Sequence, residues 1–225
     1  MKLAAAAWLV FQKDLRIELR TGEILITTGF FALLVTILTS LSFYLDDVIA
    51  RRVAPGVLWI SIAFSGVLAM GRSFQRERDH DAMRGLLLSP LPRPGIYLGK
   101  ALGIFAFLVL VELMLVPCLA VLYHLDLSPV LGQITLITLL GTLGFSAAGA
   151  LFAAMGVRVR TKELVLSVVL FPLVSPALLA GVVATREVLA GASLSEVFDW
   201  VRVLLAFDLV FLVLGALLFG PLTSE

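Results

Sequence analysis

Six long apolar runs leave this chain almost no sequence for a water-soluble domain. They cover residues 24–45, 53–70, 96–123, 130–157, 164–184 and 200–222. A helix needs roughly 20 apolar residues to cross the hydrocarbon core of a bilayer, and each run is close to that length or longer. Only 15% of the 225 residues are charged, against about a quarter in a globular domain. We therefore predict an all-α integral membrane protein with six transmembrane helices, forming one domain over residues 1–225.

The distribution of basic residues predicts the orientation of these spans. All but four of the 17 Lys and Arg residues fall in the N-terminal segment or near the second and fourth connections, which share one side of the membrane. The other side has only Arg51, Arg52, Arg186 and Arg202, together with several acidic residues. Basic residues concentrate on the cytoplasmic side of membrane proteins. Both termini are therefore predicted to be cytoplasmic.

Residues 1–22 have the pattern of a helix that lies in the membrane interface. An apolar stripe and a basic stripe follow different faces of this helix; the apolar stripe is Trp8, Phe11, Leu15 and Leu19, and the basic stripe is Lys13, Arg16 and Arg20. Such a helix would point its basic face at anionic lipid and would end at Gly22, which favours a left-handed turn. Residues 185–199 are predicted to lie on the outer surface in a similar way.

Five residues inside the spans are candidates for a transport path or a gate. Glu112 and Asp208 each cost about 3 kcal/mol in mid-membrane unless they face a partner, water or a cavity. They either line a substrate route or sense protonation, or they are structural, as neutral acids or as partners of a neighbouring polar side chain. Pro117, Pro172 and Pro176 remove backbone hydrogen bonds and bend their helices. Such bends suit a transport pathway, and they also occur in helices that only pack.

Several kinds of chemistry lack their usual sequence signals. His80 and His124 are the only histidines, Cys118 is the only cysteine, and no paired metal-ligand spacing occurs. The sequence has no glycine-rich phosphate loop and no Ser with a nearby His base. We therefore predict a non-catalytic membrane subunit with no metal site and no bound cofactor of its own. A membrane-embedded enzyme is the weaker alternative.

The charged stretch at residues 72–81 separates the second and third spans. It cannot stay in lipid, so we predict a short helix at the cytoplasmic surface, within a segment of residues 72–92. Membrane domains that are driven by a soluble motor protein often present such a helix as the contact with that protein. The alternative is that the stretch is simply solvated.

Six short stretches, in this order, resemble the haem exporter protein B (CcmB) family over essentially the full length of the chain. They are KDLRIELR at 13–20, APGVLW at 54–59, GLLLSP at 85–90, IYLGK at 96–100, LLGTLGF at 139–145, and Phe171-Pro172 with Pro176. The charged stretch departs from the family pattern, because His80-Asp81 and Arg84 replace a common acidic-Gly pair and a later Glu.

The resemblance implies an ABC-2-type permease of the cytochrome c maturation system in the bacterial inner membrane. It implies two copies of a separate cytoplasmic ATPase subunit, a haem-handling membrane protein and a small single-span subunit. Self-association of this chain is a further expectation. ATP hydrolysis would be linked to release of a haem-loaded periplasmic chaperone. An ABC-2 exporter of another substrate, such as a lipid or drug, is the alternative.

Within this family picture, the segment around the charged stretch is the expected contact with the ATPase. Helices that dock in grooves use apolar anchors ringed by polar contacts. The predicted anchors are Phe74, Met83 and Leu86, and the predicted orienting residues are Arg76, Glu77, Arg78 and Asp79.

Overall fold

The computed structural model describes residues 2–42, 47–79, 82–156 and 162–223 as a bundle of eight helices. In chain order the helices are α1 (Leu3–Thr21), α2 (Glu23–Ser42), α3 (Asp47–Asp79), α4 (Ala82–Leu88), α5 (Arg93–Leu122), α6 (Leu131–Gly156), α7 (Lys162–Leu189) and α8 (Phe198–Thr223). No strand occurs in these described ranges. The prediction of an all-α protein is confirmed.

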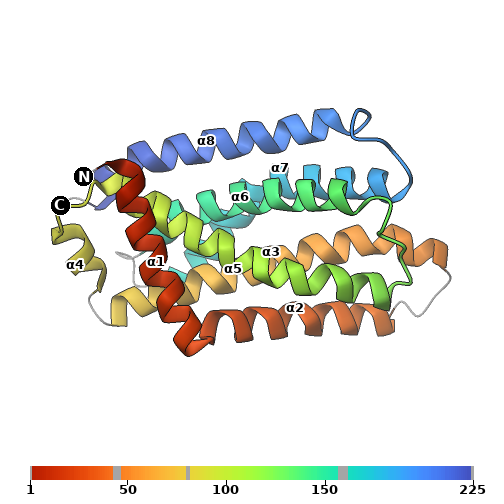
Figure 1. Cartoon of the computed structure of the whole chain (residues 1–225), viewed down its shortest axis with the longest axis horizontal. Helices are drawn as coiled ribbons and strands as arrows, with labels where there is room; N and C mark the ends of the chain where they lie inside the picture. The colour runs from red at the N-terminus through yellow and green to blue at the C-terminus, as the bar shows by residue number, and fades with distance from the viewer. Residues whose placement is uncertain (1, 43–46, 80–81, 157–161, 224–225) are drawn as a thin grey trace.

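Six of these helices contain stretches that are long and apolar enough to cross a membrane, namely α2, α3, α5, α6, α7 and α8. In Figure 1 they run along a common direction, and α1 crosses them steeply at the end where both termini lie. The short helix α4 lies at this same end. The predicted number of six spans is therefore confirmed for the described part of the chain.

Two predicted boundaries are corrected by the structure. The charged residues 72–79 are not a separate short helix, because α3 continues without a break to Asp79. Residues 185–189 belong to the end of α7, so the predicted outer segment of residues 185–199 begins only after Leu189. The predicted end of the N-terminal helix is confirmed, since Gly22 follows α1 with a left-handed φ of 63°.

Small residues of α6 let large side chains of neighbouring helices approach its backbone. Trp59 of α3 is 2% exposed. A Cβ atom on Gly141 of α6 would lie 2.2 Å from its ring, and one on Gly181 of α7 would lie 2.3 Å from it. The indole N–H donates a 3.0 Å hydrogen bond to the hydroxyl of Thr185. Trp59 therefore joins three helices inside the membrane region.

Candidate functional site

A stripe of glycines on α5 holds α1 against the bundle. Gly95, Gly99 and Gly103 recur every fourth residue and so share one face of α5. A Cβ atom on Gly99 would lie 2.6 Å from the carbonyl oxygen of Ala7, and one on Gly95 would lie 2.7 Å from the Cβ of Ala6. Both distances are too short for any side chain. The glycines therefore allow the backbone of α1 to rest directly on α5.

Gly99→Ala should loosen α1 from the bundle. The added methyl would meet backbone of α1, which cannot rotate away as a side chain can, and overpacking of this kind costs about 1–3 kcal/mol. The measurement is the thermal unfolding midpoint of the purified protein in mild detergent. Gly56→Ala is the matched control, because a Cβ atom there would meet nothing within 4 Å. Equal midpoints for the two variants would contradict the close contact.

Four charged side chains form an inner group between α1, α3 and α5. Lys100 of α5 is 1% exposed. Its Nζ lies 2.8 Å from Asp14 Oδ2 of α1 and 2.5 Å from Glu77 Oε1 of α3. Lys13 of α1 contacts the same two carboxylates, at 2.8 Å and 2.5 Å. Two cations thus face two carboxylates, and the group is electrically neutral.

The inner group favours the charged form of Lys13. Burial disfavours the ammonium, but the carboxylates of Asp14 and Glu77 together outweigh that effect and raise the pKa of Lys13 above its ordinary value. Lys13 therefore stays a cation at neutral pH and holds α1 to the end of α3.

An outer group of ion pairs extends this contact to α2. Arg76 of α3 lies 3.3 Å from Glu18 of α1 and 3.2 Å from Glu23 of α2. Arg72 lies 3.1 Å from the second oxygen of Glu23. Glu18 also accepts a 2.8 Å hydrogen bond from the backbone N–H of Leu25, in the first turn of α2. The carboxylate of Glu18 therefore fixes the turn at Gly22 as well as the position of Arg76.

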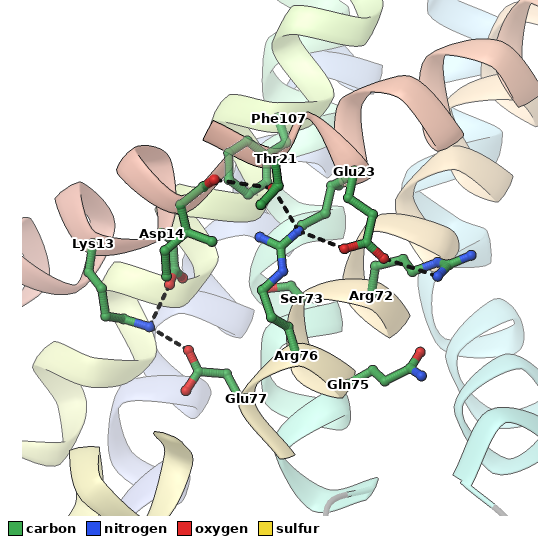
Figure 2. Close-up of a pocket in the computed structure, with 12 residues that line it drawn as sticks. Lys13, Asp14, Thr21, Glu23, Arg72, Ser73, Gln75, Arg76, Glu77 and Phe107 are labelled. Atoms are coloured by element: carbon green, nitrogen blue, oxygen red, sulfur yellow. Dashed lines mark hydrogen bonds and ion pairs between the residues drawn. The ribbon is translucent and has the colours of Figure 1, made fainter. Parts of the chain in front are cut away.

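A cavity of about 500 Å³ lies among these residues, where α1, the start of α2 and the end of α3 meet. Figure 2 shows Lys13, Asp14 and Glu77 on one side of it and Arg76, Arg72 and Glu23 on the other. Its walls carry basic and acidic side chains in equal number. The balance argues against a site for a free anion. The arrangement is suited to fastening α1, α2, α3 and α5 to one another.

The structure places the predicted coupling residues partly inside the protein. Phe74 is 4% exposed, and its ring centre lies 5.8 Å from Lys100 Nζ. Arg76 and Glu77 belong to the outer and inner ion groups. Leu86 of α4 is partly buried against the same apolar core. In this structure Phe74 and Glu77 support the fold and are not presented on the surface.

The remaining predicted coupling residues fall where side chains are not described. The backbones of Arg78 and Asp79 end α3, and that of Met83 lies in α4, but their side chains lie outside the described part. His80 and Asp81 lie outside the described residues altogether. The contact of these residues with an ATPase stays a prediction.

Sequence reasoning did not identify Asp14, Glu18 and Lys100 as site residues. In the sequence, Lys100 has only the pattern of a basic residue near the end of a span, although it is the buried centre of the inner group. Asp14 and Glu18 are four residues apart and so share a face of α1. An acidic pair on the face opposite the exposed bases was the signal that could have revealed the cluster.

The two carboxyl groups inside the membrane region both meet α6. Glu112 of α5 is 5% exposed and accepts a hydrogen bond from the hydroxyl of Thr142. Asp208 of α8 is 4% exposed, and a Cβ atom on Gly144 would lie 2.4 Å from its Oδ1. The contact of Glu112 agrees with the structural alternative, in which a neighbouring helix supplies a polar partner. A role in a transport path stays a prediction.

The three prolines lie within helices but on their outer faces. Pro117 is inside α5, and Pro172 and Pro176 are inside α7. All three are exposed in the isolated chain. A pathway that used them would therefore run along the outside of this chain, against lipid or another subunit. That role also stays a prediction.

Thr142→Val should destabilise the protein, whereas Glu112→Gln should have a small effect. Valine removes the hydroxyl donor and leaves the buried carboxyl group without that partner, which costs about 1–3 kcal/mol. Glutamine keeps a carbonyl oxygen that can accept the same bond. Thermal unfolding in mild detergent measures both effects. A larger loss of stability in Glu112→Gln than in Thr142→Val would show that the carboxyl group does more than accept this hydrogen bond.

Comparisons with known proteins agree with the resemblance found in the sequence. The chain is 28% identical over 207 residues to heme exporter protein B of Bradyrhizobium diazoefficiens, covering 92% of this chain and 91% of that protein. It is 32% identical to heme exporter protein B of Paracoccus denitrificans, covering 80% and 82% of the two chains. Heme exporter protein B of Haemophilus influenzae is 28% identical, with 76% of each chain covered. Residues 5–221 match the CcmB protein family, and the chain therefore belongs to that family.

Proposed function

We propose that this chain is the membrane permease subunit of a haem exporter that serves cytochrome c maturation. The observation that carries the proposal is the match of residues 5–221 to the CcmB family. Relatives named heme exporter protein B, which align over most of both chains, support it. The proposal places the protein in the bacterial inner membrane, where a separate ATPase subunit drives it and haem is handled by the complex.

The inner and outer ion groups together, called here the charged cluster, support a specific mechanism by which an ATPase drives such a permease. The inner and outer ion groups join the end of α3 to α1, α2 and α5. A displacement of the end of α3 would therefore also move α1 and the start of α5. On α4, Leu88 is 80% exposed and is available as an apolar contact. In this proposal the ATPase binds near Leu88, and the cluster transmits its movement to the spans.

The same proposal links ATP hydrolysis to release of the haem-loaded chaperone on the outer side. The haem-handling membrane protein and the small single-span subunit would complete the complex. The runner-up function is export of another amphiphile, such as a lipid or drug, by the same ABC-2-type architecture.

Deletion and complementation test the proposed function. A bacterium without this gene should lose its membrane c-type cytochromes, measured by haem staining, and the wild-type gene should restore them. The Gly56→Ala variant should restore them equally well, because that site has room for a methyl group. Normal cytochrome content in the deletion strain would reject the proposal. A changed lipid composition or drug resistance in that strain would then favour the runner-up.

Labelling of single cysteines tests the proposed orientation. With Cys118→Ala as background, Gln75→Cys near the end of α3 should react only with a reagent that reaches the cytoplasm. Ser128→Cys, in the connection between α5 and α6, should react from the outside. Both native side chains are exposed. The opposite labelling pattern would place both termini outside and remove the ATPase from the proposed contact surface.

A further inference from the structure

An apolar groove of about 440 Å³ runs between α1 and α5, on the flank of α1 away from the charged cluster. Eight residues line it, and none of them is polar: Trp8, Phe11, Leu15, Leu102, Phe105, Ala106, Val109 and Leu110. Its volume falls within the roughly 300–1,000 Å³ of small-molecule sites. Trp8, Leu102 and Leu110 are 55%, 40% and 44% exposed, so the groove opens to the surroundings of the bundle.

Apart from Lys13, which belongs to the inner group, the charged residues of α1 are divided between a buried acidic side and an exposed basic side. Its acidic residues Asp14 and Glu18 are buried and paired with Lys100 and Arg76. The basic residues Arg16 and Arg20 are exposed and form no ion pair in the described part of the chain. The outward side of α1 is therefore cationic, although the helix as a whole carries both signs.

We propose that this groove holds an acyl chain of an anionic phospholipid, with its phosphate bound by Arg16 and Arg20. Arg16 follows directly after Leu15, which lines the groove, and long arginine side chains can extend along apolar surface to place the charge at the headgroup level. Interfacial helices bind membranes by this combination of an apolar face and basic residues. The bound lipid would fill the groove beside the contact of α1 with α5 and stabilise the position of α1 on the bundle.

Native mass spectrometry of the purified full-length protein tests the proposal. The protein is equilibrated with equal amounts of phosphatidylglycerol and phosphatidylcholine that carry the same acyl chains. Wild type should retain one phosphatidylglycerol in preference to phosphatidylcholine. Arg16→Gln with Arg20→Gln should lower that preference roughly 10- to 30-fold, because each basic residue near an anionic headgroup contributes about a fivefold gain. Arg51→Gln with Arg52→Gln, also exposed, is the control and should bind as wild type.

Filling the groove tests the site of the acyl chain. Ala106→Trp should reduce the retained lipid of either kind, whereas Leu113→Trp, on the exposed face of α5 outside the groove, should not. If Ala106→Trp fails to fold, quenching of the native fluorescence by phosphatidylglycerol with brominated chains replaces it. Trp8→Phe should then remove most of the quenching. Equal retention of the two lipids by wild type, unchanged retention in Ala106→Trp, or unchanged quenching in Trp8→Phe would each overturn the proposal.

Discussion

Lys100→Met should destabilise the protein by about 3–5 kcal/mol, the usual cost of removing one partner from a buried ion pair. Methionine fits the space of the aliphatic stem, but Lys13 is then the only cation paired with Asp14 and Glu77 in the described part of the chain. One negative charge then stays buried without compensation. We expect a large fall in the thermal unfolding midpoint in mild detergent, together with loss of c-type cytochromes from cells that carry the variant.

A second substitution separates charge balance from packing in this experiment. Adding Glu77→Gln to Lys100→Met makes the inner group neutral again, so the double variant should recover part of the lost stability. Lys13→Met should cost less than Lys100→Met, because about a third of the Lys13 side chain is exposed to solvent. If the double variant is no more stable than Lys100→Met, the inner group does not act through charge compensation.

Trp59→Ala should lower the free energy of unfolding by about 3–5 kcal/mol, as is typical for truncating a buried aromatic side chain. The ring fills the space between Gly141 and Gly181, and neither glycine has a side chain that could close the cavity. The hydrogen bond to Thr185 is lost as well. Thermal unfolding measures the effect, with Ile60→Ala as the control, since Ile60 is a 50% exposed neighbour on the same helix.

A milder substitution separates the contribution of the Trp59 ring to stability from that of its N–H donor. Trp59→Phe keeps much of the ring and loses the N–H donor, so it should cost about 1–2 kcal/mol from the hydrogen bond and incomplete filling. A loss in Trp59→Ala no greater than in Ile60→Ala would show that Trp59 is not the tight contact between α3, α6 and α7.

The six spans could be predicted from sequence because the membrane imposes a length on each apolar run. Without water, every spanning segment must satisfy its own backbone hydrogen bonds as a helix, so apolar length alone identifies the spans. The end of α1 could also be predicted from the sequence, because Gly22 adopts a left-handed φ that most residues avoid.

The environment of the charged residues could not be predicted in the same way. A charged residue beyond the end of a span can face water or a partner on another helix, and the pattern along one helix does not distinguish these cases. Arg76 and Glu77 were expected to face outward, yet they pair with residues 23 to 64 positions away in the sequence, such as Lys100 and Lys13. The packing of α1, α2, α3 and α5 at one end of the bundle brings these partners together.

The continuation of α7 to Leu189 has a related cause. Thr185 and Arg186 ended the apolar run in the sequence, so the span was predicted to stop at residue 184. In the structure Thr185 is 1% exposed and accepts the hydrogen bond from Trp59. A polar side chain with an internal partner does not end a helix, and that partner lies 126 residues away in the sequence.

The proposed coupling to a separate ATPase is tested most directly by purifying the complex in mild detergent and measuring its ATP hydrolysis. An ATPase subunit should copurify with the wild-type chain. Leu88→Glu on the exposed face of α4 should release it and lower the hydrolysis rate at least about tenfold, the effect of losing an interface anchor. Leu194→Glu, between α7 and α8, should leave both unchanged. A wild-type chain that brings no ATPase with it, or a Leu88→Glu variant that retains it with full activity, would contradict the proposed coupling.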